Sequence, residues 1–566
     1  MALFEGLGYK PHFVEGDDPL PMHQTMASML DTALEKIQGI QREARQGSEG
    51  RPPEWPMIVL RTPKGWTGPK TVDGKPVENT WRSHHLPIED MHNPEHLRQL
   101  GEWLSSYRPE ELFARDGALI SELAELAPEG NRRMGANPHA NGGALLRDLE
   151  LPDFRACAIE VTAPGSEKAV ATEVMGSFLR EVIRSNAQWS NFRVVAPDEM
   201  ETNRLERVFE TTNRVTVQEI LPTDEFLGRS GRVMEVLSEH VCQGWLEGYL
   251  LSGRHGFFSS YEGFAHVIDS MFNQHAKWLE MSRGVSWRRP IASLNYLLTS
   301  HIWHQYRNGL THQNPGFIAQ ALTKKPDLVR IFLPPDANTL LAVTDQCLRS
   351  RNSINLIVAG NQAAPQWLDT QSAAAHAKAG IAIWDWATND QGNEPDVIMA
   401  SAGDVPTIEA LAAVDYLRQR LPDLRIRFVN ILDLMRLQPA DENPRGLSDD
   451  QYGAIFGRDK PIVFAFHGYA SFIHGVVYRR SNHECFHVCG FMEEGDVTSP
   501  FDMRVKNEID RFHLADTAVT LAAGTRNIGA EIRQDIQRRL IAHRNHVSEV
   551  GEDLPEILNW KWTAEM

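Results

Sequence analysis

Short runs of β-branched and aliphatic residues recur along this chain, and segments with helical spacing separate them. The runs are almost continuously hydrophobic, which is typical of strands that are buried on both faces of a sheet. The predicted strands are residues 57–61, 156–161, 192–197, 329–335, 354–360, 396–403, 425–432 and 461–468. The predicted helices are residues 165–185, 232–251, 337–349, 406–420 and 526–543. This alternation predicts an α/β fold in which helices cover both sides of successive parallel sheets.

The length of the chain, 566 residues, is too great for one hydrophobic core, because domains usually hold roughly 100–200 residues each. Two stretches interrupt the alternation of strands and helices. Residues 131–143 are rich in Gly, Asn and Pro and have no apolar period, so we expect a linker or a lid there. The second interruption lies at residues 367–395. We therefore expect domains at about 1–140, 145–370 and 380–566.

Charge and cysteine content narrow the range of partners. The formal net charge is −18 and no basic stripe offsets it, so we expect no nucleic-acid partner. No stretch approaches the roughly 18–20 uninterrupted apolar residues of a membrane span, and the first residues lack the features of a signal peptide. The five cysteines are sparse and odd in number, which argues against a disulfide framework. We expect a cytoplasmic protein that does not bind membranes.

The densest candidate for a functional site runs from residue 237 to residue 280. Four apolar residues with i, i+4 spacing predict a helix with an apolar stripe: Val233, Leu237, Val241 and Trp245. Glu239 would lie on this helix, near its partly buried flank. Spacing alone favours a solvated glutamate, and the functional alternative is a carboxylate that binds a partner.

Aromatic residues cluster just after this helix, namely Phe257, Phe258, Tyr261 and Phe264. Such clusters are most often part of a hydrophobic core, since aromatic side chains bury large areas. The functional alternative is a binding site for a flat heteroaromatic ligand.

Residues 299–317 form a third candidate, in which His, Gln, Asn and Arg residues lie close to Gly309 and Pro315. Polar loops at the carboxyl ends of parallel strands often carry ligand sites, although many such loops are only solvated.

Two further clusters have weaker signals. His483, Cys485, His487 and Cys489 alternate, so they would share one face of a strand. They would spread over roughly 20 Å at about 3.3 Å per residue, which is too far to close on one ion, so we expect no metal site. Lys64, His84 and His85 lie in loops that could bind phosphate or remain solvated.

Nine strings, taken together and in this order, resemble the phosphoketolase family over essentially the whole chain. They are FVEGDDP, RTPKGWTGPK, RRMGANPHANGG, EGYLLSGRHGFFSSYEGFAHVIDSMFNQHAKWLE, NGLTHQNPG, LPPDAN, EPDVIMASAGDVPT, FAFHGY and TSPFDMRVKNEIDRFHL. The resemblance implies a fold of the thiamine-diphosphate, transketolase-like type. It also implies cleavage of xylulose 5-phosphate, with fructose 6-phosphate as a further candidate, by inorganic phosphate to acetyl phosphate and a shorter aldose phosphate. Thiamine diphosphate would supply the chemistry.

The resemblance also implies an assembly. The enzyme would be a homodimer in which the diphosphate-binding domain of one subunit and the pyrimidine-binding domain of another build each site. Residues 1–140 would be the end of the diphosphate-binding domain plus a linker, 145–370 the pyrimidine-binding domain and 380–566 a C-terminal α/β domain.

The resemblance assigns roles to individual residues. Glu239 matches the glutamate that hydrogen-bonds the aminopyrimidine, and Phe264 matches the aromatic residue that packs on it. Residues matching those that face the reacting carbons and hydroxyls are Tyr261, Asn308 and His312. Residues matching the substrate and phosphate channel are His84, Lys64, Thr202 and Arg204, with Lys64 also expected near the cofactor. Asp198, in the loop that carries Thr202 and Arg204, is a further expected cofactor contact, and Gln305, Arg307 and Asn361 are expected substrate contacts.

Several positions depart from the family pattern. His85 replaces Gln, Arg307 replaces His, Asn361 replaces Lys and Thr202 replaces Ser. The Gly-Asp-Gly motif that holds magnesium and the diphosphate is absent, so we expect the Mg²⁺ ligands outside this chain and Met1 at a truncated start. The alternatives are an inactive remnant or scaffold and, against the family-specific strings, a transketolase-like carboligase.

Overall fold

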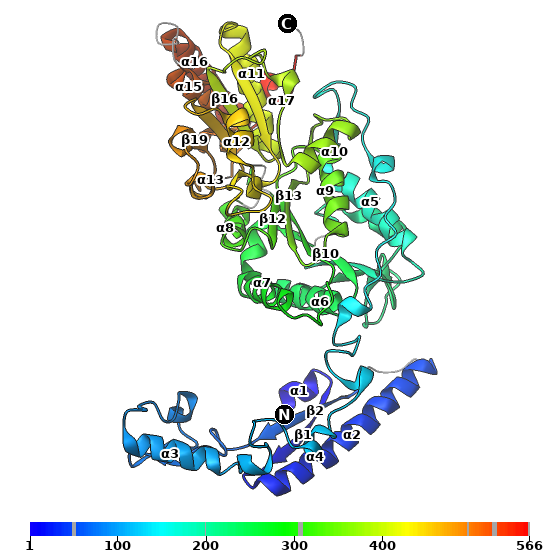
Figure 1. The fold of residues 1–566 in the computed structure, drawn as a ribbon. Helices are drawn as coiled ribbons and strands as arrows, with labels where there is room; N and C mark the ends of the chain where they lie inside the picture. The colour runs from blue at the N-terminus through cyan, green and yellow to red at the C-terminus, as the bar shows by residue number, and fades with distance from the viewer. Residues whose placement is uncertain are drawn as a thin grey trace. The chain divides into compact units, whose positions relative to one another are not determined.

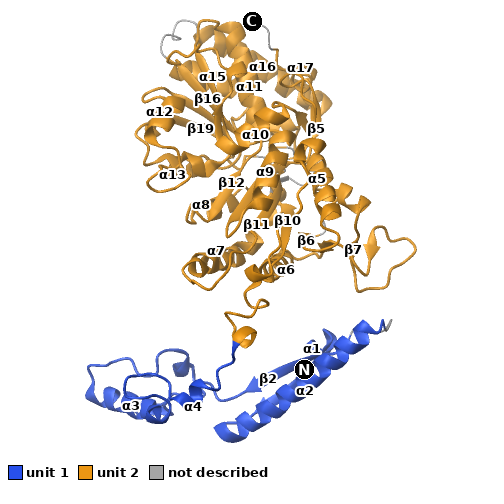
Figure 2. Cartoon of the chain, turned by 45° about the vertical axis from the view of Figure 1, so that its right-hand side comes forward, with its two compact units in different colours: residues 1–129 blue, residues 130–566 orange. Residues whose placement is uncertain are grey.

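The computed structural model describes residues 1–47, 53–197, 200–300, 302–303, 309–494, 497–522 and 529–563. Figure 1 shows their helices and strands. The chain forms two compact units, residues 1–129 and residues 130–566, which are blue and orange in Figure 2. Within the described ranges no helix is both long and apolar enough to cross a membrane.

The first unit is built around two parallel strands, β1 (Tyr9–Glu15) and β2 (Trp55–Arg61), so the strand predicted at residues 57–61 is confirmed. The long helix α2 (Pro19–Arg45) connects them. The remaining elements are α1 (Ala2–Gly6), the pair β3 (Thr71–Val72) and β4 (Lys75–Pro76), η1 (Trp81–His84), α3 (Pro94–Ser105), η2 (Pro109–Glu111) and α4 (Ser121–Ala124). A small core of Val72, Val77 and Ile88 underlies the segment from β3 to α3.

The second unit contains an eight-stranded parallel sheet in the order β12-β13-β11-β10-β6-β9-β7-β8. Its strands are β6 (Phe192–Ala196), β7 (Arg214–Val215), β8 (Leu227–Gly228), β9 (Val233–Glu235), β10 (His255–Tyr261), β11 (Leu294–Ser300), β12 (Val329–Phe332) and β13 (Ile354–Gly360). Helices α5 (Ala171–Ser185) and α9 (Ala337–Arg349) share one hydrophobic core with the sheet. Helices α6 (Glu239–Leu251), α7 (Asp269–Arg283) and α8 (Phe317–Leu322) share a different one. Helices therefore cover both faces of the sheet.

A second, five-stranded sheet has the order β15-β17-β16-β18-β19. Its strands are β15 (Ile381–Ile383), β16 (Val397–Ala402), β17 (Ile426–Ile431), β18 (Ile462–Phe466) and β19 (Phe486–Cys489), and only β15 is antiparallel to its neighbour. The helices are α10 (Thr370–Ala379), α11 (Asp404–Arg420), α12 (Asp449–Phe456), α13 (Ala470–Val477), α14 (Pro500–Lys506), α15 (Arg511–Leu521), α16 (Gly529–Val550) and α17 (Pro555–Leu558). One hydrophobic core includes residues of both sheets, such as Leu294 and Ile398. The three-domain division stays a prediction.

One expected strand is wrong and two expected helices begin later than predicted. Residues 156–161 do not form a strand, because Ile159 bonds through its backbone N–H and C=O to the side chain of Asn338 instead of to a neighbouring strand. The helix expected at 232–251 is instead β9 followed by α6, which starts only after Ser238 caps it. The helix expected at 165–185 begins at residue 171, and β5 (Lys168–Val170) pairs with β14 (Ala363–Pro365) before it.

Candidate functional site

Five neighbouring parallel strands, β13, β11, β10, β6 and β9, end at one edge of the eight-stranded sheet. The described site residues expected in the second unit lie at the ends of these strands or in the segments that follow them. Asn361 follows β13, His312 lies after β11, Tyr261 ends β10, Thr202 and Arg204 lie after β6, and Glu239 follows β9. Ligands of parallel α/β sheets bind at the carboxyl ends of the strands, so the sheet gathers these residues where a site is expected.

Three of the expected residues form a cluster of rings, which we call the ring cluster: Tyr261, Phe264 and His312. The ring of His312 lies edge-on to Phe264 with centroids 5.0 Å apart, and Tyr261 lies 6.1 Å from each of the other two. All three side chains are half-buried. Burial lowers the pKa of His312 below its ordinary value, so the neutral imidazole is favoured. The cluster therefore combines aromatic surface with a group that can accept a proton.

Glu239 is the first residue of α6, and the side chain of Ser238 accepts a hydrogen bond from the Val241 N–H at 3.3 Å. The Glu239 side chain is half-buried, and among the described residues no hydrogen-bond or ion-pair partner contacts its carboxylate. A carboxylate is favoured in the first turn of a helix, where the helix dipole is positive. The four apolar residues that were expected to form a stripe on one helix do not do so. Val233 lies in β9, and the Leu237 side chain is 79% exposed.

The loop after β6 is fixed by two amide side chains. The Asn361 Nδ2 donates to the Thr202 carbonyl oxygen at 2.9 Å, so the structure brings together two residues that were expected at the substrate channel. Asn203 is fully buried, where its Nδ2 donates to Ser259 Oγ at 3.1 Å and its Oδ1 accepts a bond from Thr299 Oγ1. Arg204 remains exposed, with a left-handed backbone at φ 61°. The sequence did not indicate Asn203 as a site residue, because a polar residue in a loop is expected to be exposed.

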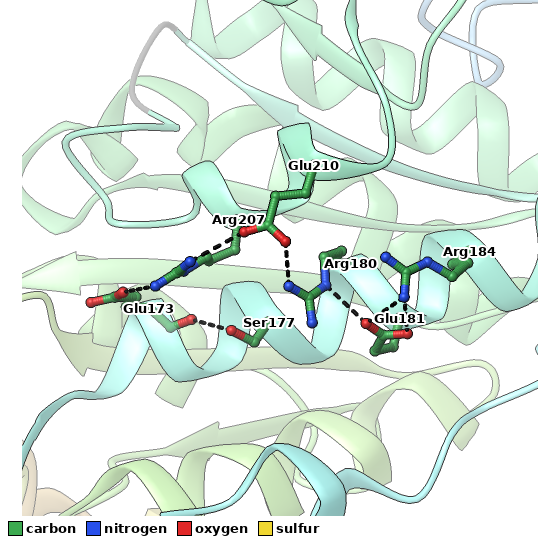
Figure 3. A network of polar contacts seen from close by, with 7 residues as sticks. All are labelled: Glu173, Ser177, Arg180, Glu181, Arg184, Arg207 and Glu210. Atoms are coloured by element: carbon green, nitrogen blue, oxygen red, sulfur yellow. Dashed lines mark hydrogen bonds and ion pairs between the residues drawn. The ribbon is translucent and has the colours of Figure 1, made fainter.

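Helix α5 packs against the segment that continues this loop. Gly176 packs so closely that a Cβ there would lie 3.3 Å from the Leu205 Cα. Figure 3 shows a network of ion pairs that joins α5 to the short helix η6 (Glu206–Glu210). Arg207 bonds Glu173 of α5 at 2.9 Å and Glu210 at 3.2 Å, and Glu210 also pairs with Arg180. These two arginines hold the pKa of Glu210 below its ordinary value, so the carboxylate stays charged.

The first unit carries the remaining described candidates. The Lys64 Nζ lies 3.3 Å from His84 Nδ1, so these two expected phosphate-channel residues are neighbours. The His85 ring lies edge-on to that of His84, with centroids 5.8 Å apart. Gly65 has a left-handed backbone at φ 77°, and a Cβ at this position would lie 2.6 Å from the Ser83 Cβ. The turn at Gly65 thus brings the lysine against η1.

Four candidates, Asp198, Gln305, Arg307 and Asn308, lie outside the described residues. In the part of the chain that the structure describes, no group of three or more His, Cys, Asp or Glu residues could hold a metal ion. The HECFHVC segment is a short helix, His483–Cys485, followed by β19. All five cysteines are described and none forms a disulfide. Burial raises the pKa of Cys489 to about 12, so its thiol stays protonated.

Comparisons with known proteins agree over the whole chain. A family model described as "D-xylulose 5-phosphate/D-fructose 6-phosphate phosphoketolase" matches residues 173–350, and the models of the N-terminal and C-terminal domains match residues 1–145 and 361–562. A probable phosphoketolase of Bradyrhizobium diazoefficiens is 59% identical over 566 residues, covering 100% of this chain and 71% of the relative. Probable phosphoketolase 2 of a Nostoc species is 59% identical over 562 residues, with 99% and 71% covered.

Solved structures resemble the fold at low identity. A transketolase of Pichia stipitis is 14% identical with a TM-score of 0.57, covering 93% of this chain and 69% of that one. A transketolase of Leishmania mexicana is 14% identical with a TM-score of 0.55, covering 92% and 67%. At this identity the likeness concerns the fold alone, and it confirms the transketolase-like architecture expected from the sequence.

Proposed function

The chain belongs to the phosphoketolase family. We propose that it cleaves xylulose 5-phosphate or fructose 6-phosphate with inorganic phosphate, and that the residues at the carboxyl ends of its parallel strands carry out this reaction. The products are acetyl phosphate and a shorter aldose phosphate. One observation carries this conclusion, namely that relatives named as phosphoketolases are 59% identical over the whole chain. The alternatives, a scaffold and a transketolase-like carboligase, have no comparable support.

The pyrimidine end of thiamine diphosphate fits the residues present. Glu239 offers a half-buried carboxylate for a hydrogen bond to the aminopyrimidine, and Phe264 offers a half-buried aromatic face for stacking. When bound, the cofactor supplies a nucleophilic carbon and an electron sink. Magnesium is different, since the described residues offer it no set of ligands and the sequence has no Gly-Asp-Gly. The chain spans 71% of the length of these relatives, and we propose that a segment of the kind found in the rest of a relative supplies those ligands.

The other site residues have roles that follow from their chemistry. His312, favoured in the neutral form, accepts and returns a proton, and the Tyr261 hydroxyl donates a hydrogen bond to a substrate oxygen. The planar fork of Arg204 in the second unit suits phosphate oxygens, and the Lys64 ammonium beside His84 is a separate candidate for a phosphate contact in the first unit. Asn361 is buried and bonded to the Thr202 backbone, so it acts on the substrate through the position of Thr202.

We propose a homodimer as the working assembly. Support comes from exposed apolar side chains beside Glu239, of which Leu237 is 79% exposed and Val241 and Trp245 are each 39% exposed. Val241 and Trp245 lie on one face of α6 at i, i+4 spacing. A partner subunit that covers this face would enclose Glu239. We place the enzyme in the cytoplasm, since none of the five cysteines forms a disulfide.

The proposed function is tested with Glu239→Gln in the chain joined to a Gly-Asp-Gly segment from a relative. The amide keeps the shape of the side chain but cannot exchange a proton, so acetyl phosphate formation should fall by about 10²–10⁴-fold. The measurement is acetyl phosphate released from xylulose 5-phosphate.

The matched control is Glu247→Gln, which changes another half-buried glutamate of the same helix. This control should retain most of the activity, and both melting temperatures should stay close to that of the parent. Retention of more than about a tenth of the rate by Glu239→Gln would contradict the assignment.

A further inference from the structure

A buried ion pair joins the two sheets of the second unit next to the ring cluster. Glu262 follows Tyr261 directly and begins the short helix η7 (Glu262–Ile268), which also carries Phe264. Its Oε2 lies 2.9 Å from the Nε2 of His467, and both side chains are 1% exposed. His467 follows β18 of the second sheet. A carboxylate from one sheet edge thus meets an imidazole from the other.

The surroundings of His467 favour its charged form. Burial alone lowers its pKa, but the charge and the hydrogen bond of Glu262, together with the charge of Asp404, raise the pKa above its ordinary value. Asp404 begins α11 and is half-buried, and its partial removal from water raises its own pKa against the attraction of His467 and Arg504. The third neighbour, Trp303, is uncharged and lies 6.4 Å from the His467 ring.

A buried ion pair is weak evidence for stability, because the desolvation of two charges offsets most of their attraction. Its position is more informative than its energy. Gly263 follows Glu262, and a Cβ there would lie 3.0 Å from the carbonyl oxygen of His312. The segment anchored by His467 is therefore in direct backbone contact with the residue that completes the ring cluster.

A second contact from the C-terminal region reaches the same place. Gln313 follows His312, is 5% exposed, and contacts the Met503 sulfur of α14 at 3.9 Å. Both segments of the ring cluster, the one that starts at Tyr261 and the one that carries His312, are thus held by side chains from beyond residue 460.

We propose that Glu262 and His467 are positioning residues. Their contact connects the ring cluster to the five-stranded, C-terminal sheet and holds the three rings of the cluster in the geometry that the reaction needs. The inference deepens the proposed function and rests on it. The C-terminal sheet then contributes to the reaction without contacting the substrate. Misplacement of a reacting group by about 1 Å is enough to lower a rate by about 10²-fold, so a positioning role predicts a large effect.

The test compares three substitutions in the chain joined to the Gly-Asp-Gly segment. Glu262→Gln removes the charge of the pair, His467→Phe removes the hydrogen-bond donor, and His467→Gln keeps a donor. For the first two, kcat should fall about 10–100-fold while the KM for xylulose 5-phosphate changes less than about threefold. His467→Gln should recover part of the loss. The Glu262→Gln/His467→Phe double variant should be no slower than the slower single variant, because both substitutions break one contact.

His376→Gln is the matched control. His376 is as deeply buried, and its Nε2 lies 2.7 Å from the Asn430 Oδ1, away from the ring cluster in sequence and in its contacts. This variant should keep kcat within about twofold of the parent. Equal losses of kcat in His376→Gln and His467→Phe, or an unchanged kcat in Glu262→Gln, would overturn the proposal. Failure of the proposed function itself is separate, since it would appear as an active Glu239→Gln enzyme.

Discussion

Buried amides do much of the positioning at the scale of single residues. Asn203 bonds to Ser259 and Thr299, which belong to β10 and β11, and Asn361 bonds to the backbone of Thr202. The Asn361 side chain makes its contact in a site that is 2% exposed, where an ammonium group without a counter-charge would be costly to bury. We propose that Asn361, where the resemblance implies a lysine in the family, holds this loop instead of contacting the substrate.

His467 gives stability a specific dependence on pH. Its pKa is raised above the ordinary value of 6.5 in the folded chain. The stability that its charge contributes is complete below pH 6.5 and is lost as the pH rises through the raised pKa. The melting temperature of the parent minus that of His467→Gln should therefore be larger at about pH 6 than at about pH 9. A difference that stays constant or grows toward pH 9 would contradict this.

The resemblance predicted the members of the ring cluster, and the structure brings Tyr261, Phe264 and His312 together. It did not indicate Asn203, Glu262 or His467. Glu262 and His467 are 205 positions apart in sequence, so periodicity and spacing carry no information about their contact. A contact between polar residues so far apart in sequence can be identified only from the three-dimensional fold, in which the ends of strands from two sheets lie side by side.

At the scale of elements, the largest error of prediction lies at residues 232–251. Hydrophobic residues with i, i+4 spacing also occur where a buried strand precedes a capped helix, as β9 and Ser238 show here. The hydrophobic strands 192–197, 329–335, 354–360, 396–403, 425–432 and 461–468 are confirmed, since their almost continuous apolar character suits a central parallel strand. Strand β11, with Asn295, Thr299 and Ser300 among its buried residues, gave no such signal.

The segment at residues 131–143 ends in a glycine pair that packs tightly within the second unit. A Cβ on Gly143 would lie 2.4 Å from the Arg289 carbonyl oxygen and 2.5 Å from that of Pro290, and neither backbone atom can move freely. Gly143→Ala should lower the free energy of unfolding by about 1–3 kcal/mol, as overpacking does. Chemical denaturation measures this.

Gly248→Ala in α6 is the control, because no atom lies within 4 Å of a Cβ at this position. This substitution should leave the stability unchanged or raise it by up to about 1 kcal/mol, since alanine favours a helix. Equal stability of Gly143→Ala and the parent would show that the glycine is not required for close packing.

At the scale of the whole molecule, the protein should sediment as a dimer at micromolar concentration. Obligate interfaces bury large apolar surfaces, so such a dimer stays associated at this concentration. Trp245→Glu should weaken it, since a charge would be buried without a partner. The control is Tyr478→Glu, because Tyr478 is 71% exposed and does not belong to α6. This variant should leave the dimer intact. A parent that sediments only as a monomer would contradict the proposed assembly.

The hydrophobic core shared by the two sheets has an evolutionary consequence. Residues of β11 and β13 pack in the same cluster as residues of β16, β17 and β18. A recombination event that replaced everything after residue 380 would therefore need to preserve the packing of this shared core, which includes Leu294 and Leu356 of one sheet and Ile398 and Val429 of the other. The two sheets are constrained to diverge together, and compensating substitutions between them are the expected trace of that constraint.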